Sequence, residues 1–277
     1  MRIVNMGEWP LSEDLHEPGP ELLWNESLYL DFATEDGTLG GYVRLGLYPN
    51  WERAWVWACV VGEGRQLTMV ADNHAPLDQQ ALTVRTVKPF EAVRVTVEEL
   101  GLDLEWRSTH GVYGYSLVPR YEIPCEVSGV VGGRPFEGYG ERDHSWGVRD
   151  WWSTSWLWSS GRLGDGTFLH GMQANVGMAL PWPAFVAKDA LHHAVDFTAA
   201  STFAEDGLPS GATLNLPGMR TTVTPLHWAP VTLVSEDGRT AEFPRALCRF
   251  TAEDGRQGYG WTEWHQPPGW RRHRWTS

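Results

Sequence analysis

The sequence has no long apolar run and few cysteines, and both shortages exclude classes of protein. No stretch reaches the roughly 18 consecutive apolar residues of a membrane-spanning helix, and the opening MRIVNMGEWP lacks the apolar core of a signal peptide. The 3 cysteines, Cys59, Cys125 and Cys248, show no CxxC spacing, so we expect buried free thiols rather than a disulfide framework. These features predict a cytoplasmic protein without an integral membrane segment.

Basic residues are outnumbered by acidic ones. The chain has 22 Lys and Arg against 35 Asp and Glu, which gives a net charge of −13. Binding to nucleic acid needs a basic face, and the one basic cluster, Arg271 to Arg274, lies in a tail where we expect it to be solvated. The composition therefore predicts no nucleic-acid partner.

Motifs for nucleotide, serine or metal chemistry are also missing. There is no Gly-x-Ser-x-Gly elbow, P-loop or dinucleotide fingerprint. Asp72, His74 and Asp78 lie in a predicted loop, but no further ligand completes a metal site at recognisable spacing. The sequence therefore predicts no metal site.

The sequence is rich in segments that predict short strands. Segments such as 26–32, 54–61 and 102–108 are rich in β-branched and aromatic residues and are bounded by turn residues. Helical periodicity is scarce, and only 75–84 and 187–195 could each support a turn or two of helix. The fold class is therefore all-β, with a sandwich and a barrel both open.

An internal repeat organises these strands into two parts. Glu122-x-Pro124 matches Glu242-x-Pro244, and Gly138-Tyr139-Gly140 matches Gly258-Tyr259-Gly260, both at an offset of 120 residues. A repeat of this kind indicates two similar β domains in tandem. We predict an N-terminal domain over 1–148 and a C-terminal domain over 149–277.

Polar and aromatic residues are concentrated where the predicted domains join, in EGYGERDHSWGVRDWW, residues 137–152. In an extended strand Tyr139, Asp143 and Ser145 share one face, whereas Arg142, His144 and Trp146 share the other. The adjacent Asp143 and His144 should therefore point apart. The repeat aligns Asp143 with Glu263.

An acid in an aromatic cavity has a clear use. Burial raises the pKa of a carboxylic acid, so that it keeps a proton to donate, and tryptophan faces stabilise developing positive charge; the chain has 17 Trp. We expect Asp143 to donate the proton, with His144 as its partner or as the alternative acid/base, and Glu263 as a second acid. Arg149 and Asp150 would orient these groups. Alternatively, ion pairs such as Arg142–Asp150 or Arg149–Asp143 only hold two domains together.

The phrases GYGERDHSWGVRDWW and WNESLYLDF resemble the tandem lipocalin-like superfamily of carotenoid 1,2-hydratases (hydroxyneurosporene synthases), tocopherol cyclases and fungal Diels–Alderases. The resemblance is closest to a bacterial branch with the RDHSWGxRDW motif. It implies two tandem lipocalin-like antiparallel β-barrel domains with few short helices. It also implies chemistry without a metal or redox cofactor on hydrophobic terpenoid- or polyketide-like molecules. The residues that match the motif are Arg142, Asp143, His144, Ser145, Trp146, Arg149, Asp150 and Trp151.

These observations support three functional hypotheses. The first is a lyase or isomerase that hydrates, isomerises or cyclises a hydrophobic small molecule in an aromatic-lined pocket. Its substrate contacts would be Trp146, Trp151, Trp156, Tyr139 and Arg142. The second is a non-catalytic carrier of a lipid or terpenoid, and the third is a scaffold with a solid, tryptophan-packed core. The sequence leaves open whether the protein forms a homodimer.

Overall fold

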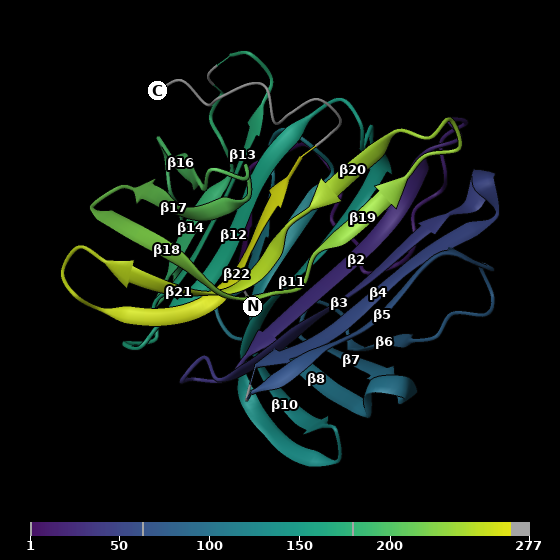
Figure 1. The fold of residues 1–277 in the computed structure, drawn as a ribbon. Coiled ribbons are helices and arrows are strands. Elements are labelled where there is room, and N and C mark those ends of the chain that lie inside the picture. The colour runs from purple at the N-terminus through teal and green to yellow at the C-terminus, as the bar shows by residue number, and fades with distance from the viewer. Residues whose placement is uncertain (1, 63, 179, 267–277) are drawn as a thin grey trace. The chain divides into compact units, whose positions relative to one another are not determined.

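The protein consists almost entirely of antiparallel strands (Figure 1). The structure, a computed structural model, describes residues 2–62, 64–178 and 180–266, so the basic cluster Arg271 to Arg274 lies outside the described residues. The predicted all-β class with two curled antiparallel sheets is confirmed. Among the described residues, no helix has the length and apolar character needed to cross a membrane.

The chain divides into two compact units. Unit 1 is Met1–Arg149 with Lys188–Leu191, and unit 2 is Asp150–Ala187 with His192–Ser277. The bounds of the lipocalin-like domains, 1–148 and 149–277, stay a prediction.

Unit 1 contains one large sheet whose first long strand pairs with its last. Along the sheet the order is β5 (Arg65–Ala75), β4 (Arg53–Gly62), β3 (Leu39–Tyr48), β2 (Trp24–Ala33), β11 (Arg134–Val148), β10 (Arg120–Val131), β8 (Leu102–Ser108), β7 (Ala92–Val97) and β6 (Thr83–Lys88). The short β1 (Ile3–Asn5) pairs in parallel with β9 (Val112–Gly114), which pairs with β10. Two 3-10 helices, η1 (Pro49–Trp51) and η2 (Glu98–Leu100), precede β4 and β8.

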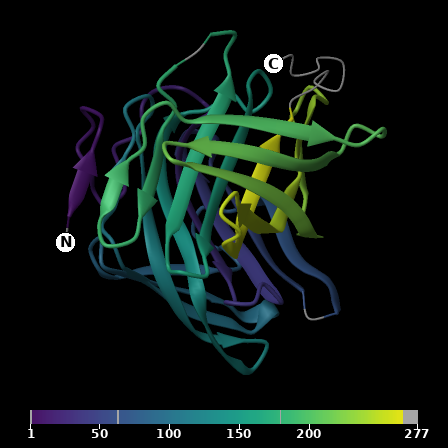
Figure 2. The ribbon, with the colours of Figure 1, turned by 90° about the vertical axis from the view of Figure 1, so that its left-hand side faces the viewer.

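Unit 2 repeats this order of strands. Figure 2 shows its strands in teal, green and yellow. Its sheet runs β15 (Leu191–His193), β14 (Ala184–Ala187), β13 (Phe168–Asn175), β12 (Ser155–Leu163), β22 (Gln257–His265), β21 (Arg245–Ala252), β18 (Met219–Trp228), β17 (Pro209–Leu216) and β16 (Thr198–Phe203). A separate hairpin joins β19 (Val231–Val234) to β20 (Thr240–Phe243). In both units the first long strand along the chain, β2 or β12, is therefore paired with the last strand of the sheet, β11 or β22.

The repeat holds in the closing strands but shifts by three residues in the strands before them. Gly138–Gly140 and 258–260 occupy β11 and β22. The match of Glu122 with Glu242 is wrong, because Glu122 lies in β10 whereas Glu242 lies in β20. The hairpin between the facing residues is three residues shorter in unit 2: Arg245 faces Glu263 across 18 positions, whereas Glu122 faces Asp143 across 21 in unit 1.

The two segments expected to favour helix contain none. In 75–84, Leu77 and Asp78 form a turn between β5 and β6, and in 187–195 a bend leads into β15. Pro76 has no N–H to donate, and the Thr83 and Val84 side chains branch at Cβ and favour a strand. Local apolar spacing was therefore an insufficient signal for helix.

The core of unit 1 lies on one face of its sheet, and three motif residues lie on that face. Leu30, Phe32 and Val43 are fully buried members of this core. Directly opposed residues of an antiparallel pair point to the same face, and Arg142 and His144 on β11 oppose Leu30 and Leu28 on β2. Charged and imidazole side chains therefore point into an apolar interior.

Candidate active site

The continuous strand β11 separates Asp143 from His144, as the alternation predicted. Asp143 interacts with Arg120, whereas His144 contacts Tyr121 and Glu26. The sequence-predicted residues on β11 thus fall into two sets. Arg142, His144 and Trp146 belong to the core face, and Tyr139, Asp143 and Ser145 belong to the other.

Asp143 is held in a buried ion pair. Arg120 donates from Nη2 to Asp143 Oδ2 at 2.6 Å and from Nε to Glu122 Oε1 at 2.6 Å. The same arginine acts on Arg149. Burial, followed by the positive charge of the nearby Arg120, disfavours the charged form of Arg149 and lowers its pKa to about 10. A carboxylate paired with an arginine in this way is engaged as a hydrogen-bond acceptor.

Glu263, the residue aligned with Asp143, is also bound by an arginine from the neighbouring strand. Arg245 pairs with one oxygen of Glu263, and Trp156 Nε1 donates to the other at 2.6 Å. Burial alone would raise the pKa of Glu263, but Arg245 and the hydrogen bonds outweigh it, so this pKa lies below its usual value. Glu263 is therefore an anion near neutral pH.

Two of the remaining predicted residues, Trp151 and Trp156, contact a histidine in unit 2. The Trp156 ring lies 3.8 Å from that of His265, and His265 Nε2 donates to the Trp151 carbonyl at 2.9 Å. Burial lowers the pKa of His265 to about 4, so this ring is neutral. Asp150 is exposed and accepts the Trp152 N–H at 3.0 Å, so it caps a turn.

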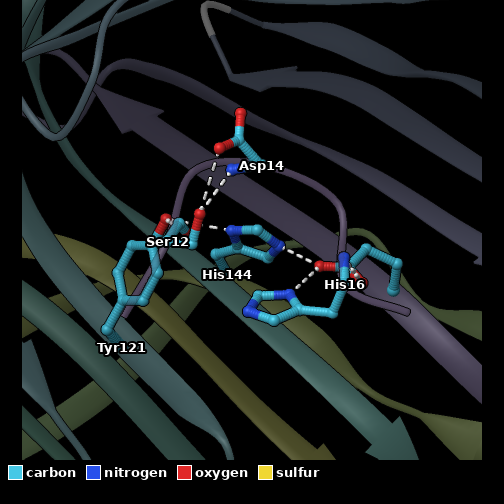
Figure 3. A network of polar contacts seen from close by, with 6 residues as sticks. Ser12, Asp14, His16, Tyr121 and His144 are labelled. Carbon is cyan, nitrogen blue, oxygen red and sulfur yellow. Dashed lines mark hydrogen bonds and ion pairs between the residues drawn. The ribbon is translucent and has the colours of Figure 1, made fainter. Parts of the chain in front are cut away.

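His144 is the centre of a hydrogen-bonded cluster inside unit 1 (Figure 3). It is 1% exposed, and its partners Glu26 and Tyr121 are 2% and 0% exposed. Tyr121 donates its one hydroxyl proton to the Ser12 carbonyl at 3.2 Å, so its oxygen accepts from His144 Nδ1 at 2.9 Å. The other ring nitrogen, Nε2, contacts Glu26 Oε1. Burial, followed by the charge of Glu13, raises the pKa of Tyr121 well above its usual value and keeps the phenol neutral.

A second histidine reaches Glu26 from an irregular segment, residues 11–16, which we call the strap. His16 Nδ1 lies 2.9 Å from Glu26 Oε1, and the His16 backbone N–H donates to Glu26 Oε2 at 3.1 Å. The His16 ring stacks on Trp146 with a centroid distance of 3.8 Å and an interplanar angle of 9°. We call His16, Glu26, Tyr121 and His144 the histidine–glutamate cluster.

Glu13 ties the strap to the sheet. It accepts from Arg142 Nη2 at 2.8 Å and from the Phe90 N–H at 3.1 Å. Burial opposes the charge on Arg142, but Glu13 outweighs it and the pKa of the guanidinium is raised. Phe90 has a left-handed φ of 59°, a strained conformation for a bulky side chain, and its ring meets Tyr121 edge-on at 5.5 Å. The strap and the Phe90 turn therefore both border the cluster.

Three atoms of the cluster could also hold a metal ion. His16 Nδ1, Glu26 Oε1 and His144 Nε2 lie within 4.8 Å of one another, and imidazole with carboxylate suits zinc or iron. In the present arrangement Nε2 and Oε1 are in direct hydrogen-bonding contact. The geometry fits a proton held between the two groups.

At the matching place in its sheet, the described residues of unit 2 include a tryptophan in place of the histidine. At the offset of 120 residues His144 corresponds to Trp264, which opposes Leu157 as His144 opposes Leu28. Trp264 packs in the apolar core of unit 2, and its Nε1 donates to Ser201 Oγ at 3.2 Å. Both units therefore contain the carboxylate–arginine pair, whereas only unit 1 has the histidine at this position of the repeat.

Sequence reasoning missed His16, Glu26 and Tyr121. Glu26 left a signal, since it alternates with Trp24, Leu28 and Leu30 on the apolar face of a strand, where an acid needs a partner. The sequence contains no such signal for His16, because the residues of the strap follow no periodic pattern of apolar and polar side chains.

A surface pocket of about 650 Å³ lies elsewhere in unit 1 and is not the predicted aromatic-lined one. Its lining includes Lys88, Glu91, Arg107 and His110 and none of the predicted aromatic residues. Lys88 and Glu91 pair with each other at 2.7 Å. We therefore assign it no role in the site.

The fold defines a class of all-β proteins with two curled antiparallel sheets, which several solved structures share. Kievitone hydratase from Nectria haematococca is 13% identical, with a TM-score of 0.63 over 97% of each chain. An AttH-type protein from Nitrosomonas europaea is 15% identical, with a TM-score of 0.64 over 87% of this chain and 92% of that one. CghA is 11% identical, with a TM-score of 0.62 over 95% and 96%. At these identities the similarity is one of fold.

The chain belongs to the family described as "Domain of unknown function (DUF7064)", which matches residues 10–268. A comparison with curated proteins finds no match to the sequence.

Proposed function

We propose that the protein is an enzyme that hydrates, isomerises or cyclises an apolar small molecule by proton transfer, and that the histidine–glutamate cluster moves the proton. The observation that carries the proposal is the buried contact between His144 and Glu26 on the core face of unit 1. Burying such a pair costs free energy that an apolar residue avoids, as Trp264 does in unit 2. A histidine beside a carboxylate is suited to acid/base work, because the carboxylate stabilises the imidazolium.

The proposal moves the chemistry from Asp143 to the other face of β11. Asp143 and Glu263 occupy repeated positions and each pairs with an arginine, which is the arrangement of structural ion pairs. Trp146 and Arg142 belong with His144, so their predicted contact with substrate is kept. One similar structure is named a hydratase, which agrees with proton transfer to a double bond. The proposed chemistry needs no cofactor.

The test uses isoprenoid alkenes in D2O, because protonation of a double bond leaves carbon-bound deuterium. Myrcene, farnesol and squalene would each be incubated with wild-type protein, Glu26→Gln and His144→Gln, and products read by mass spectrometry. General acid/base catalysis contributes about 10²–10⁴-fold, so both variants should label at least about 100-fold more slowly. His74→Gln, at an exposed histidine, is the matched control.

The alternative is a carrier, which predicts a different outcome. A carrier would copurify with an unchanged apolar compound, detectable by native mass spectrometry, and would label no alkene. That result, or labelling by His144→Gln at the wild-type rate, would overturn the proposal.

A further inference from the structure

The cluster contains one ring nitrogen that has no protein partner, and it is not on His144. Both nitrogens of His144 are engaged, Nδ1 with Tyr121 and Nε2 with Glu26. His16 engages only Nδ1, and its Nε2 is buried without a hydrogen-bond partner among the residues that the structure describes. Buried polar atoms are rarely left unpaired, so this nitrogen needs an explanation.

The surroundings of His16 fix the direction of that nitrogen. Glu26 accepts from both the ring and the backbone of His16, which clamps the residue at two points. The flat stack on Trp146 fixes the plane of the ring. The hydrogen bond to Glu26 places the neutral ring's proton on Nδ1 and leaves a lone pair on Nε2. An oriented imidazole with a carboxylate behind it and a free nitrogen in front is the arrangement of a general acid/base.

We propose that His16 Nε2 is the atom that exchanges the proton with the substrate, and that His144 and Tyr121 act by positioning Glu26. This inference rests on the proposed function and names the reacting atom of that same site. The substrate class that it implies is an apolar alkene able to lie against the Trp146 face beside His16. The side chain of His16 is 17% exposed, unlike the fully enclosed His144, so it is the imidazole nearer to solvent.

For hydration the step balances with water as the only co-reactant. Protonated His16 gives up its Nε2 proton, whose N–H bond breaks as the alkene π electrons form a new C–H bond. Water adds to the carbocation on the neighbouring carbon and forms a C–O bond. The surplus proton of that water returns to Nε2, so the net change is the addition of H and OH. Glu26 compensates the charge of the imidazolium, and Trp146 faces the developing cation.

The first test reads the tautomer directly and needs no substrate. In protein labelled with ¹⁵N-histidine, long-range ¹H–¹⁵N spectra at neutral to alkaline pH should show His16 with a proton on Nδ1 and an unprotonated Nε2. Glu26→Gln should abolish this preference. A His16 ring protonated on Nε2 in the wild-type protein would overturn the inference.

The second test separates chemistry from structure. His16→Phe keeps an aromatic ring to stack on Trp146 but has no nitrogen, and His16→Ala opens a space that added imidazole can fill. We expect His16→Phe to label alkenes at least about 100-fold more slowly, and imidazole to restore labelling in His16→Ala but not in His16→Phe. His74→Phe is the matched control.

The outcomes distinguish the two proposals. If His16→Phe labels at the wild-type rate while Glu26→Gln and His144→Gln do not, His16 is only part of the strap and this inference fails alone. If all three variants label like the wild type, or the wild type labels nothing, the proposed function fails with it. Should His16→Phe not fold, rescue of His16→Ala by imidazole decides, and absence of rescue counts against the inference.

Discussion

Replacing Asp143 by asparagine should weaken the fold of unit 1 rather than remove a proton donor. The substitution keeps the size of the side chain and one oxygen acceptor but removes the charge opposite Arg120, which is 8% exposed. Losing one partner of a buried ion pair costs about 3–5 kcal/mol. Glu122 still neutralises Arg120 through a 2.6 Å hydrogen bond, so we expect the lower end, about 3 kcal/mol.

The assay is urea unfolding followed by tryptophan fluorescence, with thermal unfolding alongside. A loss of about 3 kcal/mol should lower the thermal midpoint by about 6–12 °C in a unit of this size. Asp150→Asn is the control: its exposed carboxylate makes one turn hydrogen bond, so we expect a loss of about 1 kcal/mol or less. If Asp143→Asn unfolds like the wild type yet loses all alkene labelling, the structural interpretation of Asp143 is refuted.

Three further predictions follow from buried ionisable groups. Burial, followed by the charge of the nearby Glu141, raises the pKa of Asp31. The folded state therefore keeps a proton that the unfolded state releases, and stability falls as pH rises. Asp31→Asn should stabilise the protein at pH 8, and less so towards pH 4, as urea titrations would show. Burial lowers the pKa of His265 to about 4, so the unfolded state binds its proton first and stability falls as pH drops from about 6.5 to about 4, by about 3 kcal/mol. His265→Phe should flatten that part of the pH profile of unit 2, and an unchanged profile contradicts the assignment. Burial raises the pKa of the Cys125 thiol to about 12, so iodoacetamide at pH 8 should label Cys125 only after unfolding, as peptide mass mapping would show.

Much of the architecture was predictable because strands leave a period in the sequence. Alternation along β11 placed Asp143 and His144 on opposite faces, and the offset of 120 residues paired Asp143 with Glu263. The part that failed was the match between Glu122 and Glu242. Short motifs do not record the length of the hairpin between them, and this hairpin is three residues shorter in unit 2.

The cluster itself was only partly predictable. His144 and Trp146 lay in the motif, and Glu26 lay in a strand whose apolar face could have drawn attention to it. The contacts of His16 and Glu13 depend on an irregular strap that meets β11 more than a hundred residues later in the chain. No local pattern encodes such a meeting, since only the packed fold brings the groups together.

We assign the repeated carboxylates to the stability of the two sheets and the unrepeated histidine cluster to the chemistry. The most direct measurement is deuterium labelling of the isoprenoid alkenes by wild-type protein, His144→Gln and Asp143→Asn at equal concentrations of folded protein. We expect at least about a 100-fold loss of labelling for His144→Gln and a rate per folded molecule close to that of the wild type for Asp143→Asn. Loss of labelling in Asp143→Asn with activity kept in His144→Gln would contradict this assignment.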